Sequence, residues 1–253
     1  TLFRSSAAVS AKLLSPLLNL HDGARLFNII WLSILLLMVG MTGRELWSRG
    51  VGRHATFIMI GTIGLIISAH SLTAEVANLA CLATGFYALA LAKRRPWRAS
   101  GLLGVALGVG FLSFGLMPIL ILLSTSLILP LLFKIWRTKS FAKVLSLSIL
   151  IASPLILSWV LLLQYYYPAM LLSWWQFNLN NFTQFNHLYF LRILMWYAWP
   201  ALPFALLGLW HYRQQLLSKP QFQLMISFFT CSLFFLGLGA SSKDINALPL
   251  LLP

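Results

Sequence analysis

Positive charge in this chain is confined to short segments that alternate with long apolar runs. Most of the 18 Lys and Arg residues fall in four clusters. The nearly uncharged stretches between these clusters are long enough to cross a bilayer once or twice. Short loops that are rich in Lys and Arg tend to stay on the cytoplasmic side of a membrane. We therefore expect one shared, cytoplasmic face for the four clusters, which are Arg44, Arg49 and Arg53; Lys93, Arg94, Arg95 and Arg98; Lys134, Arg137, Lys139 and Lys143; and Arg213 with Lys219.

The composition excludes a soluble globular domain, because 60% of the 253 residues are hydrophobic and only 9% are charged. In a soluble protein, a net charge of +14 would indicate a nucleic-acid partner. Here the basic residues lie between apolar spans, where they orient the chain in a bilayer. We therefore expect membrane lipids, and no nucleic acid, as partners.

The apolar runs predict an all-α fold, a polytopic membrane helix bundle that forms a single domain over residues 1–253. A transmembrane helix needs roughly 20 residues to cross a hydrocarbon core of ~30 Å, and irregular backbone cannot face lipid. We expect about eight transmembrane helices and the start of a ninth at Ile245. The single runs are Leu26–Met41, Ala55–Ala69, Ala74–Ala92, Val144–Leu163, Leu188–Trp210 and Phe222–Ala240.

The uncharged run from Gly101 to Phe133 predicts two short helices joined by a turn within the membrane. Basic clusters flank this run on both sides, so it must cross the membrane an even number of times. Two helices of about 16 residues rise only ~24 Å each, less than the thickness of the hydrocarbon core. We expect the turn near Phe114, Gly115, Met117 and Pro118, packed against protein or a wet cavity and helping to line a pocket.

Residues 1–25 mix Arg4 and Lys12 with small and apolar residues, which predicts an amphipathic helix on the periplasmic membrane surface. Residues 164–188 form a long periplasmic segment rich in Tyr, Trp and amide side chains. Tyr and Trp favour the headgroup zone, so this loop is expected to lie along the interface. The sequence begins at Thr1 and stops within an apolar run. We therefore expect both ends to be cut from a longer membrane enzyme.

Polar residues gather on the non-cytoplasmic side of the predicted topology. Ionisable groups at membrane depth are costly and usually functional, although groups at helix ends also act as interfacial anchors. Arg and Lys bind phosphate, and a carboxylate can accept the proton of a hydroxyl or amine. A polyprenyl-phosphate sugar, with a lipid tail and an anionic head, suits this combination. The set comprises Asp22, Arg25, His70, Glu75, His187, Arg192, Lys243 and Asp244.

Three motifs add a resemblance to a known family: HDGARL from His21, GVGFLSFG from Gly108 and SSKDINALPLL from Ser241. Together with the segment Asn178–Trp210, they resemble the bacterial polytopic C-type glycosyltransferases, relatives of protein mannosyltransferases and of the aminoarabinose transferase that acts on lipid A. The resemblance implies transfer of a sugar from a polyprenyl-phosphate donor to a lipid, glycan or protein acceptor. This transfer would take place at the periplasmic face of the bacterial inner membrane.

The resemblance also implies roles for individual residues. Lys243 matches the basic residue before the family's final Leu-Pro motif and would contact the donor phosphate. Arg25 matches the Arg-Leu opening of the second span, and Glu75 falls near an acidic residue close to the active site, which makes it a catalytic candidate. The family's general base would precede Thr1, so this fragment alone is expected to be inactive. The substrate-binding candidates are Lys243, Arg192, His187, His70 and Arg25.

Two features keep alternatives open. Phe114 stands where relatives often carry Lys, so either Arg192 or Lys243 holds the phosphate or this member is altered or inactive. His70, His187 and Glu75 could ligate a divalent metal, but unliganded interfacial histidines explain them better. No metal site is therefore assigned, and the cofactor stays open.

Two other classes of function compete with an enzyme. A transporter or flippase for a lipid or small solute would place polar residues near mid-membrane, often at broken helices. The predicted spans are almost free of charge at their centres, which favours an enzyme working at the interface. A non-catalytic membrane scaffold is the third hypothesis, and Phe114 and the base expected upstream of Thr1 support it.

Overall fold

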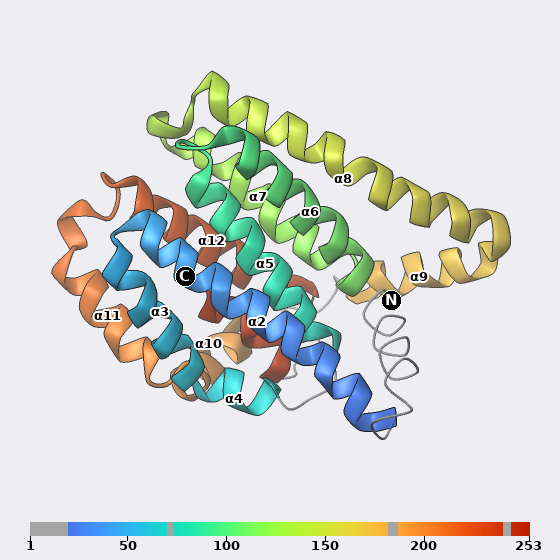
Figure 1. Cartoon of the computed structure of the whole chain (residues 1–253), viewed down its shortest axis with the longest axis horizontal. Coiled ribbons are helices and arrows are strands. Elements are labelled where there is room, and N and C mark those ends of the chain that lie inside the picture. Colours follow the sequence, from blue (N-terminus) through green and yellow to red (C-terminus); the bar gives the residue numbers. More distant parts are fainter. Residues whose placement is uncertain (1–19, 70–72, 182–186, 240–243) are drawn as a thin grey trace.

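The computed structural model describes residues 20–69, 73–181, 187–239 and 244–253, and this part of the chain is a bundle of helices without strands (Figure 1). A helix satisfies its own backbone hydrogen bonds, which is why apolar membrane segments adopt it. The predicted all-α fold class is confirmed for these residues. The helices are α2 (Leu20–Leu46), α3 (Arg49–Gly61), α4 (Ile63–Ala69), α5 (Ala74–Leu91), α6 (Pro96–Phe114), α7 (Leu116–Leu132), α8 (Lys139–Tyr166), α9 (Pro168–Asn181), α10 (His187–Tyr197), α11 (Ala201–His211) and α12 (Pro220–Gly239), with 3₁₀ segments η1 (Lys134–Trp136), η2 (Arg213–Gln215) and η3 (Asp244–Leu251).

Within the described ranges, five helices are long and apolar enough to cross a membrane: α2 from Asn28, α5, α6, α8 and α12. The number rises to seven if each bent helix pair is one span. Helices α3 and α4 meet at 65°, and helices α10 and α11 meet at 103°. The apolar helix α7 is shorter, with 17 residues. The apolar helices indicate a membrane-embedded bundle, while the total of about eight crossings, which counts α7, stays a prediction.

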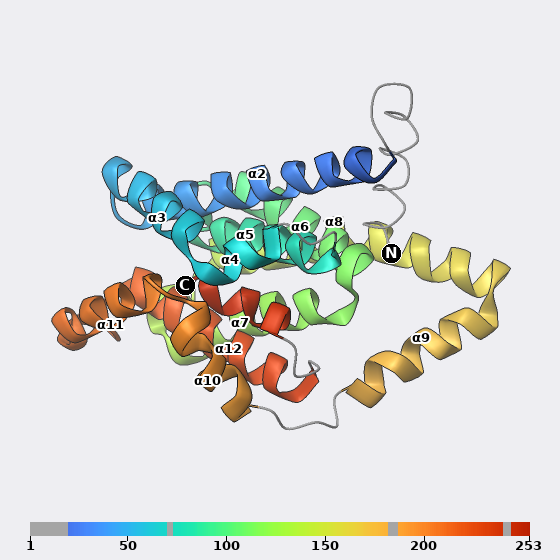
Figure 2. The same ribbon diagram turned by 90° about the horizontal axis from the view of Figure 1, so that it is seen from below.

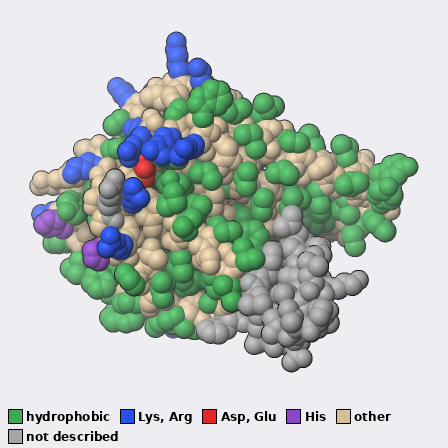
Figure 3. Space-filling view, in the orientation of Figure 1, with side chains coloured by type: hydrophobic (Ala, Val, Ile, Leu, Met, Phe, Trp, Pro, Cys, Tyr) green, Lys and Arg blue, Asp and Glu red, His purple; other side chains and the backbone are tan. Residues whose placement is uncertain are grey.

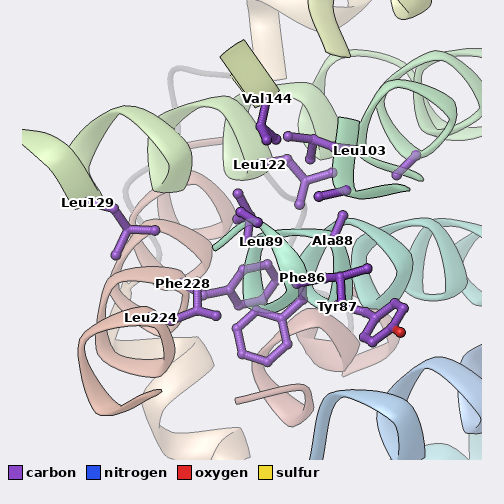
Figure 4. Close-up of a cluster of buried hydrophobic side chains, with 14 of the residues drawn as sticks. Phe86, Tyr87, Ala88, Leu89, Leu103, Leu122, Leu129, Val144, Leu224 and Phe228 are labelled. Atoms are coloured by element: carbon purple, nitrogen blue, oxygen red, sulfur yellow. The ribbon is translucent and has the colours of Figure 1, made fainter. Parts of the chain in front are cut away.

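Helix α5 lies at the centre of the bundle (Figures 1 and 2). Its side chains are buried without interruption from Val76 to Leu89. A helix that is apolar all round must be enclosed by other helices, and α2, α6, α7 and α12 all contact it. Figure 4 shows Phe86 of α5 against Phe228 of α12, with ring centroids 4.8 Å apart. Leu122 of α7 belongs to the same buried cluster, so one core joins helices from both halves of the chain.

Helices α6 and α8 pack closely and run in the same direction. A Cβ atom at Gly104 would lie 2.7 Å from Cβ of Ile151, and one at Gly108 would lie 2.5 Å from Cδ1 of Leu155. The contacts advance by four residues on both helices, as parallel helices require. Small residues spaced by four let helices approach closely in a membrane, where lipid provides no hydrophobic drive for association. Both helices begin at a basic loop, as the predicted topology requires.

A single glycine joins α6 to α7. Helix α6 ends at Phe114, α7 begins at Leu116, and Gly115 between them has a φ of 92°. A residue with a Cβ atom is strained at this φ, whereas glycine adopts it without penalty. Across the turn, a Cβ atom at Gly110 would lie 3.0 Å from Cβ of Pro118, so α7 turns back beside α6. The turn predicted near Phe114 is confirmed, and its depth in the membrane stays a prediction.

Three segments differ from their predictions. Residues 164–188, predicted as a loop, contain helix α9, which packs next to α8. From Asp244 the 3₁₀ segment η3 stands where the start of a ninth span was predicted, because Pro249 cannot donate an α-helical hydrogen bond and Leu248 and Leu250 are buried in the bundle. Helix α2 begins at Leu20, inside the segment 1–25 predicted as an interfacial helix, and residues 1–19 lie outside the described residues.

The four basic clusters gather at one end of the bundle, which we call the basic end; Figure 3 shows the Lys and Arg side chains together on the visible face. Nη1 of Arg94 lies 3.2 Å from Oε1 of Glu45 and ties the α5–α6 loop to the end of α2. Nζ of Lys93 lies 4.7 Å from the centroid of the Trp136 ring in η1. Nε1 of Trp136 donates a 2.9 Å hydrogen bond to Oε1 of Gln223, near the start of α12. The predicted grouping of the clusters is confirmed, while their cytoplasmic orientation stays a prediction.

A Trp136→Phe variant should lower the free energy of unfolding by about 1–2 kcal/mol, because Oε1 of buried Gln223 loses its donor. The cation–π contact with Lys93 is weakened as well. Unfolding in mixed detergent–SDS micelles measures the effect. Trp97→Phe is the matched control, because its side chain is 80% exposed and the change should stay within about 0.5 kcal/mol. If both variants lose the same free energy of unfolding, the hydrogen bond between Trp136 and Gln223 does not stabilise the contact between η1 and α12.

Candidate functional site

Polar side chains also lie at the opposite end of the bundle, which we call the polar end and define by Glu75, Asn78, Ser113, Tyr189 and Asp244. Helix α5 runs towards the basic end, so its first turn lies at the polar end, and Glu75 stands there, half-buried. An acidic side chain in the first turn complements the positive end of the helix dipole. Asp244 opens η3, and η3 contacts α5. Two of the four acidic residues of the chain therefore share this end.

Two tyrosines of α10 organise the polar end. The hydroxyl of Tyr189 donates a 2.8 Å hydrogen bond to Oδ1 of Asp244 and ties η3 to α10. The hydroxyls of Tyr197, two turns further along α10, and of Ser68 in α4 share a second hydrogen bond of 2.8 Å. The Tyr197 hydroxyl lies within electrostatic range of both Asp244 and Glu75. Asp244 therefore contacts one of the two tyrosines of α10 directly, and Glu75 lies at the same end of the bundle.

Two buried polar atoms beneath this end have no hydrogen-bond partner among the described residues: Oδ1 of Asn78 and Oγ of Ser113. A Cβ atom at Gly110 of α6 would lie 3.5 Å from Cβ of Cys81 in α5. Because α5 and α6 form an antiparallel hairpin, Asn78 and Ser113 lie at a common level, one turn nearer the polar end. Buried polar groups are nearly always paired, and unpaired ones are a feature of functional sites.

Helix α9 covers the turn between α6 and α7. The ring of Trp174 packs edge-to-face against Phe111 and Trp159, with centroids 5.6 and 5.3 Å away. Oδ1 of Asn178 lies 3.2 Å from the place that a Cβ atom on Gly115 would take. The turn therefore packs against protein, as its position in the sequence predicted. Its role in lining a pocket stays a prediction.

The structure describes two of the predicted substrate-binding side chains on α10. His187 opens this helix and lies against Gly237 and Phe234 of α12, with the His187 and Phe234 ring centroids 6.2 Å apart. Arg192 is exposed, while Ile193 and Leu194 beside it are buried, so Arg192 lies on the face of α10 that points away from the bundle. The structure therefore does not direct Arg192 towards the two tyrosines.

The other predicted residues lie outside the part of the chain that can be placed. His70 and Lys243 are not among the described residues, and the side chain of Arg25 in α2 is not described. Their binding roles stay predictions. Among the described residues, no three His, Cys, Asp or Glu side chains form a group that could hold a metal ion. The alternative metal site of His70, His187 and Glu75 includes an undescribed residue and stays open.

Sequence reasoning missed three members of the polar end, Tyr189, Asn78 and Ser113, as well as Tyr197 further along α10. Asn78 and Ser113 are polar residues inside otherwise apolar runs, and that contrast could have singled them out. The tyrosines gave no comparable signal, because aromatic residues are frequent throughout this chain and only the contact with Asp244 distinguishes Tyr189. Long-range pairing of this kind depends on the packing of α10 against η3.

A cavity at the basic end was also missed. Its volume is about 310 Å³, and it lies between the end of α2, α5 and the α5–α6 loop. In the sequence analysis, the arginines of this cavity were explained only by their effect on the orientation of the chain in the membrane. Next to it in the loop, partial burial lowers the pKa of Lys93. The lining residues are Met41, Arg44, Glu45, Ser48, Tyr87, Arg94 and Arg95.

Comparison with known proteins adds no relative to this description. No family model, no curated protein and no solved structure matches the chain. The two ends of the bundle therefore carry the functional features. At the polar end Tyr189 is hydrogen-bonded to Asp244 near Glu75, and at the basic end lies an arginine-lined cavity.

Proposed function

We propose that the protein moves a sugar from a polyprenyl-phosphate donor to a lipid, glycan or protein acceptor at the periplasmic face of the bacterial inner membrane. The observation that carries this proposal is that Glu75 and Asp244 lie at the same end of the bundle, away from the basic loops, with Asp244 hydrogen-bonded to Tyr189 of α10. Ionisable groups gathered at one membrane face suit a reaction on a lipid head group. The motifs that resemble C-type glycosyltransferases support the same assignment.

The residues of the polar end have separate roles in this proposal. The ammonium group of Lys243 binds the donor phosphate. The hydrogen bond from Tyr189 fixes Asp244 at the polar end. Glu75 accepts the proton of the acceptor hydroxyl or amine as the acceptor oxygen or nitrogen bonds to the anomeric carbon of the sugar. The bond between that carbon and the phosphate oxygen breaks, and its electron pair leaves with the polyprenyl phosphate. A general base upstream of Thr1, as the resemblance implies, is the alternative to Glu75 in this role.

One observation favours a second candidate, a transporter or flippase for a lipid or small solute. Helices α3 and α4 are bent by 65° and helices α10 and α11 by 103°, and broken helices line the substrate paths of many transporters. Asn78 and Ser113 add unpaired polar atoms inside apolar helices. The carboxylates, however, lie at the ends of the helical segments, which supports an enzyme at the interface as the first choice.

Transfer assays on the full-length protein in proteoliposomes test the proposal. The donor is undecaprenyl phosphate carrying a radiolabelled hexose or pentose, and the acceptors come from a bacterial envelope extract. Lys243→Ala should lower the transfer rate by about a hundredfold or more, because a cation no longer stabilises the leaving phosphate. Membrane insertion of this variant should not change. Lys219→Ala, the matched variant at the basic end, should keep the wild-type rate.

The outcomes of this assay separate the candidates. Label that reaches an acceptor supports the glycosyltransferase, and unchanged transfer by Lys243→Ala removes the phosphate role of this residue. A fluorescent polyprenyl phosphate that crosses the bilayer without sugar transfer supports the flippase. Neither transfer nor crossing by the full-length protein supports the scaffold.

A further inference from the structure

The cavity at the basic end combines charge from segments that are far apart in the sequence. Arg44 and Glu45 come from the last turns of α2, Arg94 and Arg95 from the α5–α6 loop, and Tyr87 from the body of α5. Its volume is about 310 Å³. One water molecule takes about 30 Å³ in the liquid, so the cavity is larger than a few water molecules require. The fold therefore builds a concave, arginine-lined site, and not merely a charged surface.

The charges in this cavity do not cancel. The carboxylate of Glu45 pairs with Arg94, with Nη1 of the arginine 3.2 Å from Oε1 and 3.5 Å from Oε2. The side chain of Glu45 is 16% exposed, so its charge is held close to the cavity wall. Arg44 and Arg95 form no ion pair with any described residue. Two guanidinium groups are therefore left to bind an anion.

The hydroxyl of Tyr87 lies among these guanidinium groups. Glu45, Arg95, Arg44 and Arg98 all act electrostatically on this hydroxyl, the carboxylate of Glu45 most strongly. Figure 4 shows the Tyr87 ring directed away from the pair of Phe86 and Phe228 and towards the ribbon of α2. A phenolic hydroxyl donates a hydrogen bond, so the wall of the cavity offers a neutral donor beside the two cations.

The cavity lies where the apolar helices end, which is the level of lipid head groups. Arg44 stands in the last turn of α2, and Arg94 and Arg95 follow directly after α5. Trp97, two residues beyond Arg95, is 80% exposed, and Trp47 near the end of α2 contributes a second exposed ring. Tryptophan favours the boundary between hydrocarbon and water. An anion that reaches the cavity at this depth is therefore most readily one that is carried by a lipid.

We propose that this cavity binds the phosphate of an anionic phospholipid head group, with Arg44 and Arg95 as its main ligands and Tyr87 as an additional donor. The planar fork of arginine matches the geometry of phosphate oxygens, and basic pockets between transmembrane helices bind anionic head groups. Free phosphate shares this chemistry but has no acyl chains to hold it at the interface. The proposal rests on membrane embedding alone and stands independently of sugar transfer.

Lipid binding to the purified protein tests the site. Native mass spectrometry from a neutral detergent measures the affinity for dioleoylphosphatidylglycerol, for dioleoylphosphatidylcholine and for inorganic phosphate. Wild-type protein should bind phosphatidylglycerol at least about tenfold more tightly than phosphatidylcholine. The Arg44→Ala/Arg95→Ala double variant should lose at least about tenfold in affinity for phosphatidylglycerol, because two charge-assisted contacts are removed.

Matched variants separate the cavity from net charge. Arg53→Ala/Lys139→Ala removes the same charge from exposed positions of the basic end that do not line the cavity, and it should bind phosphatidylglycerol like the wild type. If the double alanine variant does not fold, Arg44→Lys/Arg95→Lys keeps the charge without the fork and should bind severalfold more weakly. Equal losses in both alanine pairs, or equal affinity for the two lipids, would overturn the proposal. Inorganic phosphate binding as tightly as the lipid would assign the cavity to the free ion and overturn the lipid assignment.

Discussion

A Glu75→Gln variant of the full-length protein should transfer sugar at least about a hundredfold more slowly than the wild type. Glutamine keeps the shape of the side chain but cannot accept the acceptor's proton, and general base catalysis is worth about 10²–10⁴ in rate. The first turn of α5 holds Glu75 half-buried at the polar end, close to Tyr197. Initial rates with the radiolabelled polyprenyl-phosphate donor measure the effect.

Glu75→Asp is the control for this experiment, because it keeps a carboxylate on a side chain that is shorter by one methylene group. Partial activity in Glu75→Asp with little in Glu75→Gln would support a proton acceptor. The thermal midpoints of both variants should match that of the wild type, since Glu75 forms no ion pair with any described residue. Full activity in Glu75→Gln would contradict the role of Glu75 and would move the general base to another part of the protein.

Gly115→Ala should lower the free energy of unfolding by about 2 kcal/mol. The φ of 92° at this residue is strained for any side chain, and such strain costs about 1–3 kcal/mol. The new Cβ atom would also lie 3.2 Å from Oδ1 of Asn178, so α9 has to move away from the turn. Unfolding in mixed detergent–SDS micelles measures the loss, and faster proteolysis within residues 168–181 should accompany it.

Gly101→Ala provides the comparison for Gly115→Ala, because Gly101 lies in α6, the helix that Gly115 follows, and a Cβ atom there would meet no atom within 4 Å. Alanine is the better helix former, so this variant should be neutral or up to about 1 kcal/mol more stable. A Gly115→Ala protein as stable as Gly101→Ala would mean that the turn relaxes freely. In that case α9 would not depend on the turn for its position.

The sequence predicted those parts of the fold that follow from transfer of side chains between water and lipid. Clustered Lys and Arg residues cannot enter hydrocarbon, so their spacing was sufficient to predict that the four loops share one end. The parity of the run from Gly101 to Phe133 was sufficient to predict a turn near Phe114 to Pro118, and the structure places it at Gly115. Both arguments are local and need no knowledge of packing.

The parts that escaped prediction depend on contacts between distant segments. Helix α9 was missed because its aromatic and amide residues were assigned to the headgroup zone from their composition alone. The cavity at the basic end was missed because it exists only once Glu45 of α2 meets Arg94 beyond α5. In the candidate site, Glu75 and Asp244 were singled out as rare acidic residues, whereas Tyr189 required the observed hydrogen bond.

Helix α8 is long in relation to the bilayer, and its own length has a physical consequence. Its 28 residues rise about 42 Å, against a hydrocarbon core of about 30 Å. The buried residues of α8 are Phe141, Val144, Ser148 and Ala152, all in its first half. The second half has no fully buried side chain, and a helix longer than the hydrocarbon core can satisfy the hydrophobic mismatch by tilting. Only one residue separates α8 from α9. A change in bilayer thickness that tilts α8 should therefore also change how α9 packs against the turn at Gly115.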